Sequence, residues 1–140
     1  MRILGIDYGE ARTGFAITDE LNITVQGLET LNGTDKEVLK KIDEYLEKYE
    51  IGTIVIGMPF SLNGNKSIRT EKTEKFMHKL KCKYNKIKIE YIDERLTTVA
   101  AHKTMNILNI DKKKKKKIVD TISAVYILET YVNKIKNSDV

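Results

Sequence analysis

The stretch Arg2–Thr18, RILGIDYGEARTGFAIT, decides the expected fold. It holds two short apolar runs, Arg2–Ile6 and Thr13–Thr18, separated by a polar segment with the character of a turn. Asp7 follows the first run directly, where a buried strand would leave its sheet. A third strand-like run, Val25–Leu31, comes after another short polar connection. Short connections favour antiparallel neighbours, so this part of the chain predicts a three-strand meander.

After the meander the pattern changes to alternating helices and strands. Apolar strands are expected at Thr53–Gly57 and Lys88–Ile92, with a loop at Met58–Asn65 after the first of them. Helices are expected from a Thr34-x-x-Glu37 capping box onward, over Ser67–Lys81, over Thr97–Leu108, and from Ile118 to about Asn133. Strands joined by helical crossovers pair in parallel. The expected fold class is therefore α/β: a mixed five-stranded sheet, with a three-strand meander plus two crossover strands and helices on both faces.

Length and composition limit the class of protein. A chain of 140 residues with 41% hydrophobic residues fits a single domain spanning residues 1–140. The single cysteine, Cys82, excludes a disulfide framework and an all-cysteine zinc site. Asp7 interrupts the first apolar run, so no secretory signal is expected, and no apolar stretch approaches the roughly 18 residues of a membrane span. We expect a reduced, soluble, cytoplasmic protein without a membrane partner.

The positive charge of the chain is local. Residues 1–65 hold 6 basic and 11 acidic side chains, whereas residues 66–140 hold 19 basic and 9 acidic ones. Residues 112–117 are six consecutive lysines. The net charge of the chain is +5, so without these six positive charges it would be −1. Such a run is either a solvated loop or an arm that contacts phosphates. Its position three residues before Asp120 favours the second interpretation.

Three carboxylates are expected at one edge of the sheet. Asp7 follows the first strand, and Asp93 and Glu94 follow the last one; in an open parallel sheet, ligands bind beyond these carboxyl ends. Asp120 shares a helical face with the apolar Ala124 and so is expected to point into the protein. Taken singly, each acid has a plain alternative: a turn residue, an ion pair with the neighbouring arginine, or an acid stabilised at a helix N-terminus. Taken together, clustered carboxylates need a counter-charge, and oxygen-only ligands suit Mg²⁺ or Mn²⁺.

Four segments of the chain, in order, also match a known family. They are Gly5–Gly9 with Arg12–Gly14, Val55–Pro59 with Asn63-Gly64, Asp93–Thr98, and Val119-Asp120 with Ser123-Ala124 and Ile127–Glu129. In these segments the chain resembles the YqgF family of Holliday junction resolvases, within the ribonuclease H-like superfamily. The resemblance covers nearly the whole chain.

The resemblance implies a ribonuclease H-like fold and a nuclease that depends on Mg²⁺ or Mn²⁺. Its catalytic and metal-binding positions match Asp7, Glu94 and Asp120. It implies a nucleic-acid partner, either the precursor of the small-subunit ribosomal RNA or branched DNA. No apolar stripe of the sequence clearly demands a symmetric dimer, so we expect a monomer or weak homodimer. The residues that we expect to contact nucleic acid are Tyr8, Arg12, Asn63, Arg69, Arg95, Lys112, Lys113, Lys114, Lys115, Lys116 and Lys117.

Two other functions remain open at this point. One is a factor that binds nucleic acid in ribosome assembly or transcription without cleaving it. The other is an ATP-binding domain, because Asp7-Tyr8-Gly9 between two strands also resembles the phosphate loop of sugar kinases and actin-like ATPases. Those proteins close two such domains over a nucleotide, and this chain supplies one. A shift of the melting temperature by ATP would distinguish this function from the others.

Overall fold

The computed structural model describes residues 1–97 and 112–138, and in the last helix it describes side chains from residue 121 to residue 137. The strands are β1 (Arg2–Asp7), β2 (Arg12–Thr18), β3 (Val25–Asn32), β4 (Ile51–Met58) and β5 (Lys88–Asp93). The helices within these ranges are α1 (Asp35–Lys48), α2 (Ile68–Lys83), the 3-10 turn η1 (Glu94–Leu96) and α4 (Lys112–Ser138). The helix expected over Thr97–Leu108 lies outside the described residues from position 98 onward.

The five strands form a single mixed sheet in the order β3-β2-β1-β4-β5. The pairs β1/β2 and β2/β3 are antiparallel, whereas β1/β4 and β4/β5 are parallel. The predicted meander and the two crossover strands are therefore confirmed. The register aligns Ile6 with Ile56 and Gly57 with Ile92, so β1, β4 and β5 end at one edge of the sheet. We call this the carboxyl edge.

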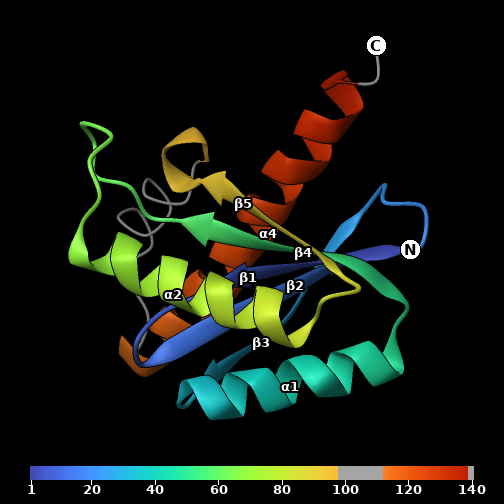
Figure 1. The fold of residues 1–140 in the computed structure, drawn as a ribbon, viewed down its shortest axis with the longest axis horizontal. Coiled ribbons are helices and arrows are strands. Elements are labelled where there is room, and N and C mark those ends of the chain that lie inside the picture. Colours follow the sequence, from blue (N-terminus) through green and yellow to red (C-terminus); the bar gives the residue numbers. More distant parts are fainter. Residues whose placement is uncertain (98–111, 139–140) are drawn as a thin grey trace.

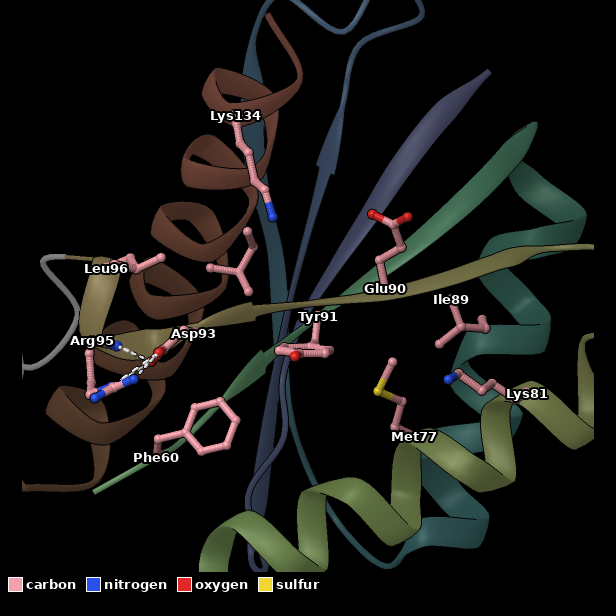
Figure 2. A pocket seen from close by; sticks show the side chains of 11 residues that line it. Phe60, Met77, Lys81, Ile89, Glu90, Tyr91, Asp93, Arg95, Leu96 and Lys134 are labelled. Carbon is pink, nitrogen blue, oxygen red and sulfur yellow. Dashed lines mark hydrogen bonds and ion pairs between the residues drawn. The ribbon is translucent and has the colours of Figure 1, made fainter. Parts of the chain in front are cut away.

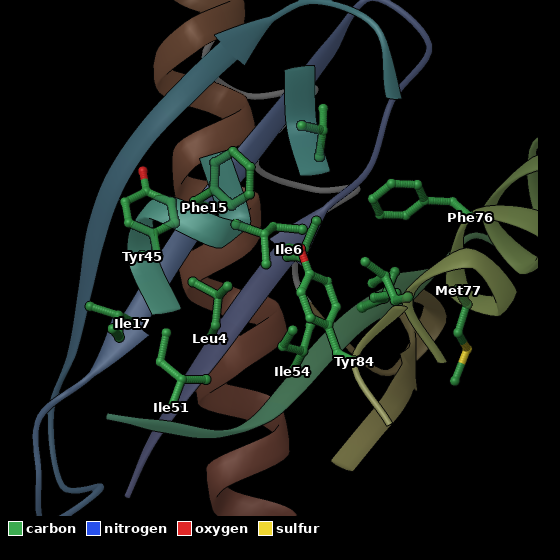
Figure 3. Close-up of a cluster of buried hydrophobic side chains, with 14 of the residues drawn as sticks. Leu4, Ile6, Phe15, Ile17, Tyr45, Ile51, Ile54, Phe76, Met77 and Tyr84 are labelled. Carbon is green, nitrogen blue, oxygen red and sulfur yellow. The ribbon is translucent and has the colours of Figure 1, made fainter. Parts of the chain in front are cut away.

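Helices cover both faces of the sheet, as predicted. Figure 1 shows α1 and α2 on one face and α4 across the other. Alternate side chains of each strand serve the two layers, because successive strand residues point to opposite faces. Leu4, Ile6 and Phe15 pack with side chains of α1 and α2, such as Phe76 (Figure 3). Ile3, Ala16 and Val55 pack against α4 in a second cluster.

The last helix lies directly on the sheet because glycines leave it room. A Cβ atom at Gly5 would be 3.0 Å from Leu128 Cβ and 3.2 Å from the Ala124 carbonyl oxygen.

Helix α4 begins at Lys112, six residues before the expected start at Ile118. The interpretation of the lysine run as a loop is therefore wrong. The physical reason is that lysine is a good helix former and the run contains no glycine or proline to stop the helix.

The start of each of the first two helices differs in detail from the expectation. Thr34 is the N-cap of α1, but its hydroxyl donates to Glu37 Oε1 at 3.5 Å and makes no cap hydrogen bond to the backbone, so the predicted capping box is wrong. A capping box forms instead between Ser67 and Thr70 at the start of α2. The Thr70 hydroxyl also donates to the Pro59 carbonyl at 2.5 Å. This bond ties α2 to the loop that leaves β4.

Four tyrosines share one arrangement, in which the hydroxyl meets a carboxylate that is also paired with a lysine. The groups are Tyr8–Asp35–Lys79, Tyr45–Glu29–Lys41, Tyr84–Asp43–Lys83 and Tyr131–Glu90–Lys88. In the third group the hydrogen bond from Tyr84 lowers the pKa of Asp43, burial opposes it, and Lys83 adds to the lowering. In the other three, burial raises the pKa of the carboxyl, but the tyrosine and lysine outweigh it.

These groups predict how stability depends on pH. A carboxyl whose pKa is lower in the folded chain stabilises it above the unfolded pKa, about 3.9–4.3, and this contribution is lost as pH falls through the folded value. We expect the urea midpoint to hold at pH 6 and to fall progressively below about pH 5. Tyr84→Phe removes the main cause of the Asp43 shift, so its midpoint should fall less steeply between pH 5 and pH 3.

Tyr91→Phe is the matched control for this measurement, because among the described residues no carboxylate accepts a hydrogen bond from the Tyr91 hydroxyl. It should leave the pH profile unchanged. Equal slopes for the unchanged chain and Tyr84→Phe would contradict the assignment of the Asp43 contribution to Tyr84.

In the described ranges, no helix combines the length and the apolar character needed to cross a bilayer.

Candidate functional site at the carboxyl edge

Asp7 is a buried carboxylate at the end of a central strand. It is the last residue of β1 and is 4% exposed. It lies two residues after Gly5, whose open side faces Leu128 of α4. Because alternate strand residues share a face, Asp7 is on the α4 face of the sheet. A charge so far removed from water needs compensation from its surroundings.

Glu94 reaches the same place from β5. It opens η1, directly after the strand, and its Oε1 atom would be 2.9 Å from a Cβ atom at Gly57. Ile6 pairs with Ile56, so Gly57 is the next partner along, beside Asp7, on a strand about 4.8 Å away. Two of the predicted acids therefore lie on the same face of the carboxyl edge: Asp7 comes from β1, and Glu94 reaches from the end of β5 over Gly57 of the intervening strand β4. The missing side chain of Gly57 makes the space for Glu94.

The third predicted acid, Asp120, is part of the α4 backbone, but its side chain lies outside the described residues. Its neighbour Thr121 is described, and the Thr121 hydroxyl is 2.6 Å from the hydroxyl of Thr30 on β3. Thr30 pairs with Gly14, and Gly14 pairs with Asp7. This part of α4 thus lies at the register level of Asp7, two strands away. A role for Asp120 at the site stays a prediction.

The described donors fit a hard divalent cation. Asp7 and Glu94 offer carboxylate oxygens, which Mg²⁺ and Mn²⁺ prefer. Among the side chains that are described, no three His, Cys, Asp or Glu residues form a metal-holding group. A complete site would therefore need a ligand beyond the described side chains, water, or a phosphate of the substrate. Mg²⁺ is commonly bound by one or two carboxylates completed in this way.

The predicted phosphate contacts differ in their positions. Arg12 begins β2 two residues before Gly14, so it is on the same face as Asp7, and it is half-buried. Arg69 is exposed in the first turn of α2. Asn63 is exposed in the loop after β4, where its Oδ1 accepts a hydrogen bond from the Asn65 N–H at 3.0 Å. Of these three, Arg12 is on the face that carries the acids.

Arg95 holds the end of β5 to the loop after β4. Its Nη2 atom donates to Asp93 at 2.6 Å and its Nε at 3.0 Å, and this bonding lowers the pKa of Asp93. The guanidinium lies 5.7 Å from the centre of the Phe60 ring. Its Nη1 atom would be 3.2 Å from a Cβ at Gly64, which has a φ of +86° that glycine adopts without strain. These contacts fix the backbone next to Glu94.

Tyr8 packs on the other face of the sheet. Its ring stacks on Phe76 with 4.1 Å between the centroids, and its hydroxyl donates to Asp35 at 2.5 Å. Burial, together with Asp35, raises the pKa of the Tyr8 hydroxyl. This placement favours a structural role for Tyr8 over the predicted contact with a base.

Sequence reasoning did not single out Gly57 as part of the site. Its side of the strand meets both Glu94 and Ile127 of α4, so any larger residue would displace one of them. A usable signal was present, because a glycine inside an apolar strand often marks a close approach of another group. Phe60 and Tyr91, discussed below, were missed as well, and nothing in the sequence distinguished them from ordinary core aromatics.

Comparisons with known proteins identify relatives of this chain. A family model described as RuvX, Holliday junction resolvase, matches residues 1–134. A protein of Ruminiclostridium cellulolyticum named "Putative pre-16S rRNA nuclease" is 50% identical, with 96% of each chain covered. A protein of the same name from Acetivibrio thermocellus is 47% identical, over 95% of this chain and 96% of the relative.

Solved structures show the likeness of the fold. T. thermophilus RuvC in complex with a Holliday junction substrate matches with a TM-score of 0.58 at 11% identity, over 96% of each chain. The fowlpox virus resolvase in complex with junction DNA has a TM-score of 0.58 at 12% identity, over 96% of this chain and 99% of the resolvase. These matches confirm the expected α/β fold class.

Proposed function

This chain belongs to the RuvX family of Holliday junction resolvases, and from that premise we propose that it hydrolyses phosphodiester bonds with a divalent metal held at the carboxyl edge. The observation that carries the proposal is that Asp7 and Glu94 share one face of the carboxyl edge, with Glu94 lying over Gly57, the neighbour of Asp7 in the sheet. Two carboxylates on one face of a sheet edge, one of them buried, are costly without a cation. A divalent cation bound at a nuclease site would offset this cost.

Asp7, Glu94 and Asp120 would hold Mg²⁺ or Mn²⁺. Such an ion, when bound, activates water and stabilises the charge that develops on the phosphate. The buried strand end keeps Asp7 in a single position, and η1 with the Arg95–Asp93 bonds keeps Glu94 over Gly57. Arg12, on the same face, can orient a phosphate through its planar fork of donors.

The substrate that we propose is the precursor of the small-subunit ribosomal RNA. The support for it is the pair of relatives at 50% and 47% identity that carry the name of a pre-16S rRNA nuclease. Branched DNA is the second candidate, supported by the description of the family model. A resolvase cuts two strands symmetrically and therefore works as a pair of subunits, whereas a monomer or weak homodimer suffices to process RNA.

A cleavage assay distinguishes these substrates. The purified chain is incubated with Mg²⁺, Mn²⁺ or EDTA and with a precursor RNA, an unstructured RNA of equal length, or a four-way DNA junction. We expect cleavage of the precursor with a metal and none with EDTA. Cleavage of the junction alone would favour the second substrate. Binding of the RNA without cleavage under any condition would support a non-cleaving assembly factor and contradict the proposal.

The lysine run at 112–117 is expected to strengthen binding through phosphate contacts. Successive residues of an α-helix are about 100° apart, so only about half of six consecutive residues can share a face. Replacing all six lysines with Gln should therefore reduce the slope of log Kd against log salt by about 2 for single-stranded RNA, at roughly 0.7 per lost contact. Six Lys→Arg replacements are the matched control and should keep the slope. An unchanged slope in the Gln variant would make the run a solvated helix end.

A further inference from the structure

A cavity of about 680 Å³ lies along β5, next to the carboxyl edge. Strand β5 is at the end of the sheet, so no strand of the described residues pairs with its outer side. The cavity extends over both faces of the strand: Figure 2 shows Lys134 and Glu90 on one side, and Tyr91, Met77 and Lys81 on the other. A second cavity of about 370 Å³ shares Phe60, Tyr91 and Lys81 with it and continues toward α2.

The floor of this groove is aromatic and open to solvent. The rings of Phe60 and Tyr91 meet edge to face, with 6.3 Å between their centroids. Tyr91 is 49% exposed, and Leu96, which also lines the cavity, is 71% exposed. We call Phe60, Tyr91 and Leu96 the β5 shelf. Large apolar side chains gathered in this way at the surface indicate a binding site more often than isolated ones do.

The charge around the β5 shelf is positive once the existing pairs are removed. Both acids of the groove are already neutralised: Glu90 by Lys88 at 2.9 Å and Asp93 by Arg95 at 2.6 Å. Lys81 and Lys134 form no ion pair within 4 Å of another described residue. They stand on opposite sides of β5, so they could contact an anionic chain laid along the strand.

The β5 shelf is also continuous with the proposed catalytic site. Phe60 follows Gly57 by three residues, and Leu96 follows Glu94 by two. The Arg95 guanidinium lies over the Phe60 ring and bonds Asp93, so the shelf and Glu94 are held by the same contacts. A nucleic-acid strand whose phosphate is at the carboxyl edge can therefore place its next nucleotides over the groove.

We propose that the β5 shelf binds unpaired bases of a single-stranded segment next to the scissile phosphate, with Lys81 and Lys134 contacting its backbone. This inference rests on the proposed nuclease function. Only unpaired bases can turn a face onto an aromatic ring, since bases of a duplex are stacked on one another. An open edge strand can also pair with a strand of another protein, but Lys81 and Lys134, which form no ion pair within 4 Å among the described residues, favour an anionic ligand.

The test measures binding without cleavage. The full chain in EDTA is titrated with a fluorescent ten-nucleotide single-stranded RNA and with a blunt RNA duplex of the same sequence. Tyr91→Ala should weaken single-strand binding about 30-fold, the middle of the range for one stacked base, and change duplex binding less than twofold. Tyr91→Trp keeps a ring and should restore binding. Leu21→Ala, at an exposed position in the β2–β3 connection, is the surface control.

The lysines give an independent readout. Changing Lys81 and Lys134 to Gln together should reduce the salt slope for single-stranded RNA by about 1.4. Unchanged single-strand affinity in Tyr91→Ala, or equal losses for single strand and duplex, would overturn the proposal. So would self-association that Tyr91→Ala abolishes while RNA affinity stays constant, because β5 would then pair with a second copy of the chain.

The two proposals fail in different ways. If Tyr91→Ala weakens single-strand binding but the unchanged chain cleaves nothing with either metal, the result supports the β5 shelf and contradicts the nuclease function. If the chain cleaves and Tyr91→Ala binds and cleaves like the unchanged chain, the result supports the nuclease function and contradicts the β5 shelf.

Discussion

Asp7→Asn is expected to reduce phosphodiester cleavage by at least about 100-fold. Asparagine keeps the shape of the side chain but removes the charge that would hold a divalent cation. Even residues that only support metal ligands cost about 10- to 100-fold when changed, so a ligand itself should cost more. Asp7 is buried at the end of a central strand. The measurement is the single-turnover cleavage rate with Mg²⁺.

The control for this variant is Glu20→Gln, which makes the same change of charge in the β2–β3 connection, outside the carboxyl edge. It should cleave at the rate of the unchanged chain. The melting temperature of Asp7→Asn is measured in parallel, so that a loss of cleavage can be distinguished from a loss of folding. Full activity of Asp7→Asn would exclude Asp7 as a metal ligand, whatever the substrate.

Gly57→Ala is expected to damage both stability and cleavage. Its Cβ atom would be 2.9 Å from Glu94 Oε1 and 2.9 Å from Ile127 Cγ1, with Ile127 Cδ1 closer still. Overpacking of this kind costs about 1–3 kcal/mol of unfolding free energy. Moving Glu94 aside by about 1 Å should also slow cleavage about 100-fold, since misplacements of that size cost about that much in enzymes.

A second substitution separates the two effects. Ile127→Val removes Cδ1, the nearest atom, so Gly57→Ala with Ile127→Val should regain stability while Glu94 stays displaced and cleavage stays slow. Gly52→Ala is the matched control on the same strand: its Cβ would be 2.8 Å from Met1 Sδ, the flexible end of an exposed side chain that can move. If the double variant recovers cleavage together with stability, Gly57 matters only for the packing of α4.

Much of the fold could be predicted from local patterns. The five strands were expected within two residues of their ends, because apolar runs bounded by polar turns are local signals. Short connections indicated the antiparallel meander, and helical crossovers indicated the parallel pairs. Details that depend on competing hydrogen bonds were missed. The hydroxyl of Thr34 bonds to Glu37 instead of the backbone, and the lysine run continues α4 instead of forming a loop.

For the proposed site, apolar runs followed directly by acids were enough to predict that Asp7 ends β1 and that Glu94 follows β5. Topology alone then brings them to one edge, because parallel strands end together. The position of Glu94 over Gly57 and the packing of Tyr8 on the far face became visible only in the folded chain. The same is true of the groove that Phe60 and Tyr91 line. Each of these depends on contacts between side chains distant in the chain. Periodicity shows which face a residue occupies, but the neighbour that it meets there depends on how the layers pack.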